Sequence, residues 1–178
     1  MCIRDRSYGD KVLSKSYVKI YLFQGLIIFL VGFPALFINS TVTPPVSIGF
    51  EISAISLLIG VIIWIIGFYF ESIGDYQLRK FKKNPENKGQ ILDQGLWKYT
   101  QHPNYFGEVT MWWGIFIIAL GVPWGFITIF GPIFITYMII KVSGVRLLNY
   151  RYRKDEKYAD YKRRTSAFIP WFPKKKKE

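Results

Sequence analysis

The chain contains three long stretches without a charged residue, at 20–50, 52–70 and 109–140, of 31, 19 and 32 residues. A helix of about 20 apolar residues is long enough to cross the hydrocarbon core of a bilayer, which is roughly 30 Å thick. Stretches of this length are too long for the ordinary core elements of a soluble domain. The pattern therefore predicts a protein that crosses a membrane several times.

Turn-forming residues divide two of these stretches. The first contains Asn, Ser and Thr at 39–41 and two prolines at 44–45, which suit a connection outside the hydrocarbon. The third would form a straight helix of about 48 Å, so we expect a break at 121–125, where two glycines flank a proline. The predicted spans are residues 17–38, 51–70, 104–120 and 124–141. The predicted fold class is all-α, a polytopic membrane bundle of about four helices.

The basic residues gather at one end of these spans. Of the 24 Lys and Arg residues, five fall in 1–19, six in 79–98 and 13 in 141–178, and the two outer loops contain none. The positive-inside rule then places both termini and the middle loop in the cytoplasm. A three-span arrangement would break this agreement. The basic tail, residues 174–178, is predicted to rest on anionic headgroups.

Composition excludes several classes of protein. The net charge is +12, but its placement follows the membrane topology, so no nucleic-acid partner is predicted. Cys2 is the only cysteine, and no His or Cys spacing is typical of a zinc site, so neither a disulfide nor a metal is predicted. The sequence lacks a Walker loop and a Gly-x-Gly-x-x-Gly turn, which excludes the common soluble nucleotide folds. We interpret residues 1–10 as a non-native or disordered leader and residues 11–173 as one membrane domain.

Four charged residues share one face of a helix that is predicted to continue from the second span. These residues are Glu71, Asp75, Arg79 and Lys82. Two interpretations are open. The face is either a solvated, salt-bridged helix end or a polar surface that receives the ribose and phosphates of a nucleotide. Carboxylates accept hydrogen bonds from hydroxyl groups, while Arg and Lys bind phosphate, so the residue types suit the second interpretation.

The segment richest in polar chemistry precedes the third span. Pro103 suits the first turn of a helix, so Asn104 and Glu108 fall one turn apart on a common face where this span enters the membrane. A carboxylate in that position is costly to desolvate unless it receives donors. The pair therefore either faces a ligand or caps the helix. His102, the only histidine, either donates to a phosphate or substrate carbonyl or is a satisfied turn residue.

The C-terminal segment predicts an amphipathic cytoplasmic helix with an aromatic face. The residues of this face are Leu147, Tyr150, Tyr158 and Tyr161. The helix either lies on the membrane surface or closes its aromatic face over a cofactor, in which case Arg146 or Arg163 holds the phosphates. The apolar segment 167–173 follows and is predicted to be rigid and to re-enter the interface.

Together these segments resemble a known family. The motifs are Asp75-Tyr76-Gln77, Asn87-Lys88-Gly89, Gly95-Leu96-Trp97-Lys98-Tyr99, His102-Pro103-Asn104-Tyr105-Phe106-Gly107-Glu108, Ser143-Gly144 and Tyr158-x-x-Tyr161-x-x-x-Thr165-x-x-Phe168-Ile169-Pro170. In order and spacing they resemble the bacterial branch of the steroid 5-alpha-reductase family, the DUF1295 group, over residues 11–173. His-Pro-x-Tyr alone also occurs in the related isoprenylcysteine carboxyl methyltransferases.

The resemblance implies a reductase of the bacterial inner membrane that uses NADPH. Its substrate would be a steroid-like or other lipophilic enone, whose carbon–carbon double bond receives the hydride. The residues expected at the cofactor are Asp75, Arg79, Lys82, Tyr99, His102, Asn104, Glu108, Arg146, Tyr158 and Arg163. Glu108 would lie near the nicotinamide carboxamide, which offers donors, while Lys82 and Arg146 match basic positions of the family.

The chain departs from the family at two places. Family members often have a glutamate where this chain has Asn149, and they are longer at the N-terminus, where the acid and tyrosine that polarise the substrate carbonyl lie. We therefore expect a C-terminal cofactor half that binds NADPH weakly, if at all, and turns over poorly alone, and we assign no catalytic residue. Two other functions stay open: a methyltransferase using S-adenosylmethionine and a non-enzymatic membrane scaffold that binds lipid headgroups or partners.

Overall fold

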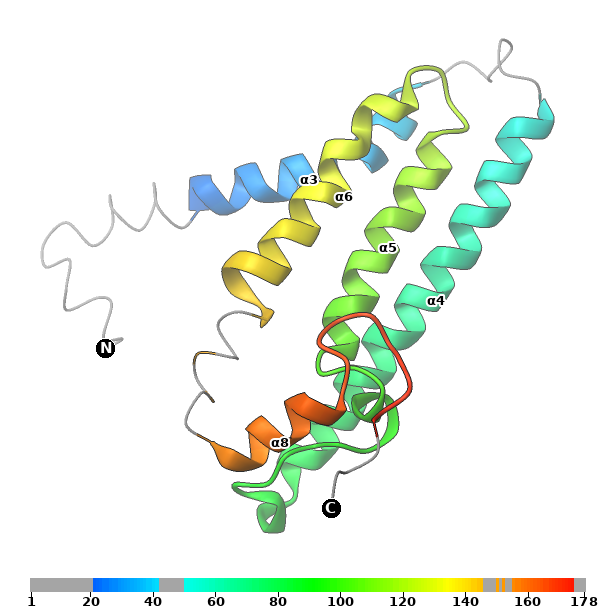
Figure 1. Ribbon diagram of the computed structural model, residues 1–178. Coiled ribbons are helices and arrows are strands. Elements are labelled where there is room, and N and C mark those ends of the chain that lie inside the picture. Colours follow the sequence, from blue (N-terminus) through cyan, green and yellow to red (C-terminus); the bar gives the residue numbers. More distant parts are fainter. Residues whose placement is uncertain (1–20, 42–49, 146–149, 151, 153–154, 175–178) are drawn as a thin grey trace, which may run out of the picture.

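The computed structural model describes residues 21–41, 50–145, 150, 152 and 155–174 (Figure 1). The elements in chain order are α3 (Phe23–Ser40), α4 (Phe50–Lys83), η3 (Pro85–Asn87), η4 (Gly95–Lys98), α5 (Pro103–Ala119), η5 (Gly125–Ile129), α6 (Phe130–Tyr137), η6 (Met138–Ser143) and α8 (Glu156–Arg164). Within this part of the chain the one pairing of strand type is an isolated bridge between Thr100 and Ser166. The predicted all-α class is confirmed. The predicted leader at 1–10 and the tail beyond Lys174 lie outside the described residues.

Three helical segments among the described residues are long and apolar enough to cross a membrane, which makes the chain a membrane protein. They are Phe23–Ser40, Ser53–Lys83 and Gly125–Val142. α5 has 17 residues, at the short end of the spanning range of about 17–25 residues. It lies alongside α4 (Figure 1). The count of four crossings stays a prediction that depends on α5.

α4 is a single helix of 34 residues that runs from the apolar part of the molecule into the charged part. Its first two thirds contain the charge-free stretch 52–70, and its last turns carry the charged residues from Glu71 to Lys83. The predicted continuation of the second span into a charged helix is confirmed. The charged end of α4 extends beyond the apolar stretch and forms one side of the candidate site.

Glycines spaced seven residues apart allow α4 and α5 to pack backbone against backbone. Gly60 and Gly67 on α4 face Gly114 and Gly107 on α5. A Cβ atom on Gly67 would lie 2.7 Å from the carbonyl oxygen of Gly107, which is closer than real Cβ contacts. Small residues permit such close approach of membrane helices. Gly74 continues the row and places the charged end of α4 against the first turn of α5.

α3 and α6 pack together against α5 and complete the apolar part of the bundle (Figure 1). The rings of Phe33 and Phe130 lie 5.1 Å apart, and the indole nitrogen of Trp113 donates to the Thr136 hydroxyl over 3.2 Å. The predicted break at 121–125 is confirmed as a turn. The helix after it is irregular, because a 3-10 turn precedes α6 and a π turn follows it.

α8 is shorter than the predicted C-terminal helix and turns its aromatic face toward the protein. It begins after Asp155, whose carboxylate accepts a hydrogen bond from the backbone N–H of Tyr158 over 3.2 Å. Tyr158 and Tyr161 are 7% and 3% exposed. These two tyrosines therefore pack inside the molecule, which favours the second of the two interpretations of this helix. Tyr150, which was predicted on the same face, lies outside α8 and is 63% exposed, so that part of the prediction is wrong. Leu147 lies outside the described residues.

Residues 165–174, which we call the C-terminal strap, return along the segment that leads into α5. The backbone N–H of Gln101 donates to the carbonyl of Ser166, and that of Trp171 donates to the carbonyl of Tyr99, both over 2.9 Å. Backbone hydrogen bonds of this kind hold two extended segments in a fixed register. The strap therefore fixes the segment from which the candidate site receives its buried polar side chains.

Candidate functional site

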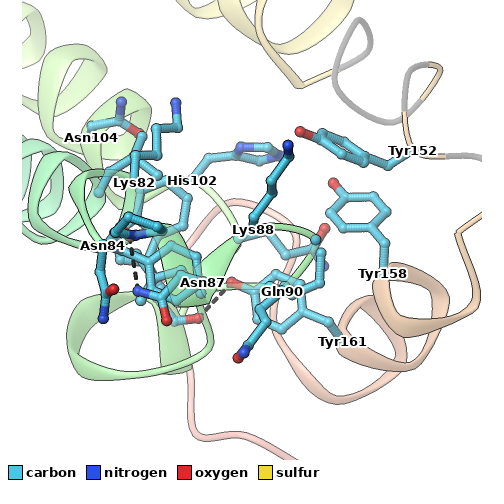
Figure 2. A pocket seen from close by; sticks show the side chains of 18 of the residues that line it. Lys82, Asn84, Asn87, Lys88, Gln90, His102, Asn104, Tyr152, Tyr158 and Tyr161 are labelled. Atoms are coloured by element: carbon cyan, nitrogen blue, oxygen red, sulfur yellow. Dashed lines mark hydrogen bonds between the residues drawn. The ribbon is translucent and has the colours of Figure 1, made fainter.

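A cavity of about 520 Å³ lies at the charged end of the α4–α5 pair (Figure 2). Its walls come from the end of α4, the loop after α4, the segment before α5, and α8. The polar side chains that line it are Lys82, Asn84, Asn87, Lys88, Gln90, Gln101, His102, Asn104, Tyr105, Tyr152, Tyr158 and Tyr161. Ligand pockets of proteins usually enclose about 300–1,000 Å³, so this cavity has room for a small organic molecule.

The tyrosine wall of the cavity is held by buried hydrogen bonds. The hydroxyl of Tyr161 donates to the carbonyl of Trp97 over 2.6 Å, and the Trp97 indole nitrogen donates to the carbonyl of Gly74 over 3.1 Å. Burial raises the pKa of Tyr161 well above its ordinary range, so its hydroxyl stays protonated and remains a donor. The rings of Tyr158 and Tyr152 lie 5.2 Å apart. This chain of contacts joins α8 to α4 across the cavity.

Two neighbouring polar side chains lie buried at the cavity with unused hydrogen-bonding capacity. Gln101 and His102 are 4% and 2% exposed. The amide nitrogen of Gln101 donates to the carbonyl of Thr165 over 2.7 Å, but its Oε1 has no partner in the described part of the chain. Both ring nitrogens of His102 also lack one there. Buried polar atoms are normally paired, so three unpaired atoms beside a cavity indicate a place for a polar ligand.

The imidazole of His102 is neutral at physiological pH. Its burial, together with the nearby charge of Lys162, lowers its pKa to about 4. In the neutral ring one nitrogen is a donor and the other an acceptor. His102 can therefore form one hydrogen bond of each kind with a ligand.

We predict that acid destabilises the protein through His102. The unfolded chain binds a proton at this residue near pH 6.5, whereas the folded chain binds it only near a pKa of about 4. The free energy of unfolding should therefore fall as the pH decreases from about 6.5 toward 4. Thermal denaturation at several pH values measures this, and His102→Gln, which cannot titrate, should show a smaller loss. An equal loss in both proteins would contradict the prediction.

An acidic and amide corner borders the cavity where α4 meets α5. The side-chain nitrogen of Asn104 donates to Oδ1 of Asp75 over 2.9 Å, and Asn104 itself lines the cavity. The carboxyl groups of Glu71 and Glu108 lie near enough to Asp75 to interact with it electrostatically. Among the described residues, no group of three or more His, Cys, Asp or Glu side chains is arranged to hold a metal ion. The corner instead offers hydrogen-bond acceptors to hydroxyl or amide groups.

Two exposed lysines supply positive charge at the cavity. Lys82 from the end of α4 and Lys88 from the loop after it both line the cavity (Figure 2). Neither forms an ion pair with a carboxylate in the described part of the chain. Their ammonium groups are therefore available to an anionic ligand.

The structure brings some of the predicted cofactor residues together and separates others. Those that line the cavity are Lys82, His102, Asn104 and Tyr158, and Asp75 is one hydrogen bond away. Those that do not line it are Arg79, Tyr99, Glu108 and Arg163. Arg163 pairs with Asp160 over 3.3 Å, and the Tyr99 ring contacts Phe172 of the C-terminal strap. Arg146 lies outside the described residues.

Two residues of the cavity, Gln101 and Lys88, were not among the cofactor residues predicted from the sequence, although both belong to polar segments. Lys88 lies between Asn87 and Gly89, two turn formers, which is a signal for an exposed loop cation. No local signal marks Gln101, because its burial depends on the distant C-terminal strap.

A family model described as "Protein of unknown function (DUF1295)" matches residues 3–165 of the chain. The chain belongs to the DUF1295 family. This is the group that the sequence motifs resemble, so the affiliation predicted from them is confirmed. No solved structure matches this DUF1295 protein.

The DUF1295 protein is homologous to steroid reductases at low identity. It is 28% identical to 3-oxo-5-alpha-steroid 4-dehydrogenase 1 of Bos taurus over 115 residues, which cover 64% of this chain and 41% of the bovine protein. With the protein of the same name from Rattus norvegicus it shares 26% identity over 114 residues, again 64% and 41% of the two chains. The matched stretch thus spans less than half the length of these relatives. This homology relates the chain to the steroid 5-alpha-reductase family.

A shorter match points to another kind of enzyme. Over 65 residues the chain is 37% identical to a protein named Probable O-methyltransferase ustE from Ustilaginoidea virens. The stretch covers 36% of this chain and 22% of that protein. A methyltransferase using S-adenosylmethionine was one of the functions that the sequence left open, and this match is a reason to test it.

Proposed function

We propose that this DUF1295 protein binds NADPH in the cavity and takes part in the reduction of a lipophilic enone. The substrate class would be a steroid-like or other apolar molecule with a carbon–carbon double bond conjugated to a carbonyl. The homology to 3-oxo-5-alpha-steroid 4-dehydrogenases supports the reaction type. The lipophilic substrate fits a protein that lies in a membrane.

The observation that carries the proposal is the combination of buried, unpaired polar atoms with unpaired cations around one cavity. The unpaired atoms of Gln101 and His102 suit a neutral polar group of a ligand. Lys82 and Lys88 suit an anionic group. NADPH contains both kinds of group, since it has a carboxamide, a purine, hydroxyl groups and phosphates. The residues present therefore fit this cofactor.

The chain would contribute binding and orientation, while NADPH supplies the hydride. Lys82 and Lys88 would hold phosphate oxygens, and the corner of Asp75 and Asn104 would bind ribose hydroxyl or carboxamide groups. Gln101 and His102 would fix a second polar part of the ligand. The buried tyrosine wall would exclude water from this part of the cavity.

The distribution of charge supports a cytoplasmic cavity. Among the described residues, the basic residues of the last turns of α4 and α8 lie at the end of the bundle where the cavity is, and the positive-inside rule places such an end in the cytoplasm. We propose that the protein resides in a bacterial inner membrane with both termini on that side. A lipophilic substrate would then reach the site from the bilayer, while the water-soluble cofactor would enter from the cytoplasm.

Equilibrium binding to the detergent-purified protein tests the proposal. NADPH, NADH and S-adenosylmethionine are titrated separately, up to high concentration because we expect weak binding by this chain alone. Tighter binding of NADPH than of the other two supports the proposed function. Preferential binding of S-adenosylmethionine, or binding of none by this chain and by an N-terminally extended version, would contradict it.

Glu108 does not line the cavity but lies close to Asp75 in the corner that borders it. A ligand group that reaches this corner would meet the Glu108 carboxylate, which accepts stronger hydrogen bonds than a neutral amide does. Glu108→Gln is therefore predicted to weaken NADPH binding by about tenfold. The fold should persist, since no hydrogen bond or ion pair of the Glu108 side chain holds the described residues together. Glu86→Gln, at an exposed position in η3, is the control and should bind like the parent. An unchanged dissociation constant in Glu108→Gln would remove this residue from the cofactor contacts.

The match to an O-methyltransferase favours one alternative, in which the cavity binds S-adenosylmethionine. That cofactor has a sulfonium, an ammonium and a carboxylate group but no phosphate. Lys82 and Lys88, which have no ion-pair partner among the described residues, would then have a single carboxylate to bind. The sulfonium would lie in a positively charged environment. The charge of the cavity therefore favours NADPH.

A further inference from the structure

The C-terminal strap exposes three large apolar side chains. Ile169, Trp171 and Phe172 are 66%, 70% and 78% exposed. Large apolar residues are usually at least partly covered in a folded protein, and two exposed aromatic rings and an isoleucine within four positions indicate an interaction surface. These three residues, which we call the strap tip, do not contribute to the cavity.

The strap tip is held by the rest of the molecule. The hydroxyl of Thr100 donates to the carbonyl of Phe168 over 2.7 Å, immediately before the tip. Within the tip, the backbone N–H of Trp171 donates to the carbonyl of Tyr99 over 2.9 Å. After the tip, the backbone N–H of Lys174 donates to the carbonyl of Arg164 over 2.9 Å. The exposed side chains are therefore presented from a fixed backbone.

A row of aromatic rings places the strap at the edge of the apolar part of the bundle. The rings of Phe70 and Phe106 lie 5.1 Å apart, and those of Phe106 and Phe168 lie 6.0 Å apart. Phe70 is the last residue of the charge-free stretch 52–70 of α4, and Phe106 lies in the first turn of α5. Figure 1 shows the strap beside this end of α5. The strap thus lies at the depth where the apolar helices leave the membrane.

Positive charge adjoins the strap tip. Lys174 is exposed, and the sequence continues with three more lysines at 175–177. Tryptophan is enriched where membrane proteins meet the headgroup region, and lysines beside such residues attract anionic lipids. Apolar rings, position and charge thus favour a lipid surface as the partner.

We propose that Ile169, Trp171 and Phe172 insert into the lipid leaflet at the basic end of the bundle, with the lysines at 174–177 attracting its anionic headgroups. This interaction does not depend on the ligand of the cavity. It has a consequence for that site, because the strap also contains Thr165, whose carbonyl accepts the hydrogen bond from Gln101. Contact with lipid would anchor the same segment that holds a wall of the cavity.

Fluorescence quenching of the full chain in lipid vesicles tests the proposal. Cys2 is first replaced by serine, so that a single cysteine can be labelled. Phe172→Cys in this background is then labelled with an environment-sensitive fluorophore. Lipids that carry a nitroxide group below the headgroup serve as quenchers. Ile65→Cys on the exposed apolar face of α4 is the lipid reference, and Glu86→Cys in η3 is the water reference. We expect the Phe172 probe to be quenched about threefold more than the Glu86 probe and nearly as much as the Ile65 probe.

Vesicles of phosphatidylcholine alone and with phosphatidylglycerol test the role of charge. Quenching at Phe172 should increase with the anionic lipid, and glutamine at all four lysine positions 174–177 should remove that increase while leaving the Ile65 probe unchanged. Quenching of the Phe172 probe equal to that of the Glu86 probe would overturn the proposal. Protection of the Phe172 probe from both lipid and soluble quenchers would also overturn it, since a protein surface would then cover the strap tip.

Discussion

Replacing Gly107 by alanine is expected to lower the free energy of unfolding by about 1–3 kcal/mol, the usual cost of inserting a methyl group into a fully packed contact. The new Cβ would meet the backbone nitrogen of Glu71 and the carbonyl oxygen of Gly67, which cannot move aside as a side chain can. α4 and α5 would have to separate. Circular dichroism during thermal unfolding in detergent measures the loss, and Gly67→Ala should reproduce it from the other helix.

Gly32→Ala is the matched control. Gly32 is also a glycine within an apolar helix, but nothing lies within 4 Å of the Cβ that alanine would add. Alanine favours helix over glycine by about 1 kcal/mol, so this variant should unfold at the same temperature as the parent or slightly higher. If Gly107→Ala were as stable as Gly32→Ala, the close packing of α4 and α5 would not be a source of stability.

Replacing Lys82 and Lys88 together by glutamine is expected to weaken NADPH binding on the order of a hundredfold, because each lysine is proposed to make a charge-assisted hydrogen bond to phosphate. The preference for NADPH over NADH should decrease as well if either lysine contacts the 2′-phosphate. Titration of both nucleotides with the parent and the double variant measures the two effects.

The control for this experiment removes the same amount of charge elsewhere. Lys80 and Lys98 are exposed lysines close to the cavity in sequence that do not line it. Glutamine at both positions should leave the dissociation constant almost unchanged. An equal loss of affinity in the two double variants would indicate a general effect of net charge and would contradict specific phosphate contacts.

The helices of the apolar part could be predicted closely from the sequence. A charge-free stretch such as 52–70 has one stable solution in a bilayer, a helix that satisfies its own backbone hydrogen bonds. The turn at 121–125 could be predicted equally well from the sequence, because its glycines and proline interrupt a helix. The length of α8 was not predicted, since its start depends on the cap that Asp155 provides to Tyr158.

The candidate site was predicted only in part, for two physical reasons. The burial of Gln101 depends on Thr165, which lies 64 residues away in the sequence and leaves no local pattern. Arg163, in contrast, could have been placed from the sequence. At about 100° per residue it lies on the side of α8 opposite to Tyr161, so a helix that turns its tyrosines inward turns Arg163 outward.

The length of α4 has a mechanical consequence. Its 34 residues form a rod of about 51 Å, roughly 20 Å longer than the hydrocarbon of a bilayer, and it contains no proline at which it could bend. A membrane of different thickness therefore changes the inclination of the whole rod. Lys82 lies next to the C-terminal end of the helix, so a small change in inclination displaces it more than it displaces residues near the middle of the helix. Lipid chain length is thus a physical variable that acts on the geometry of the cavity at the charged end of this helix.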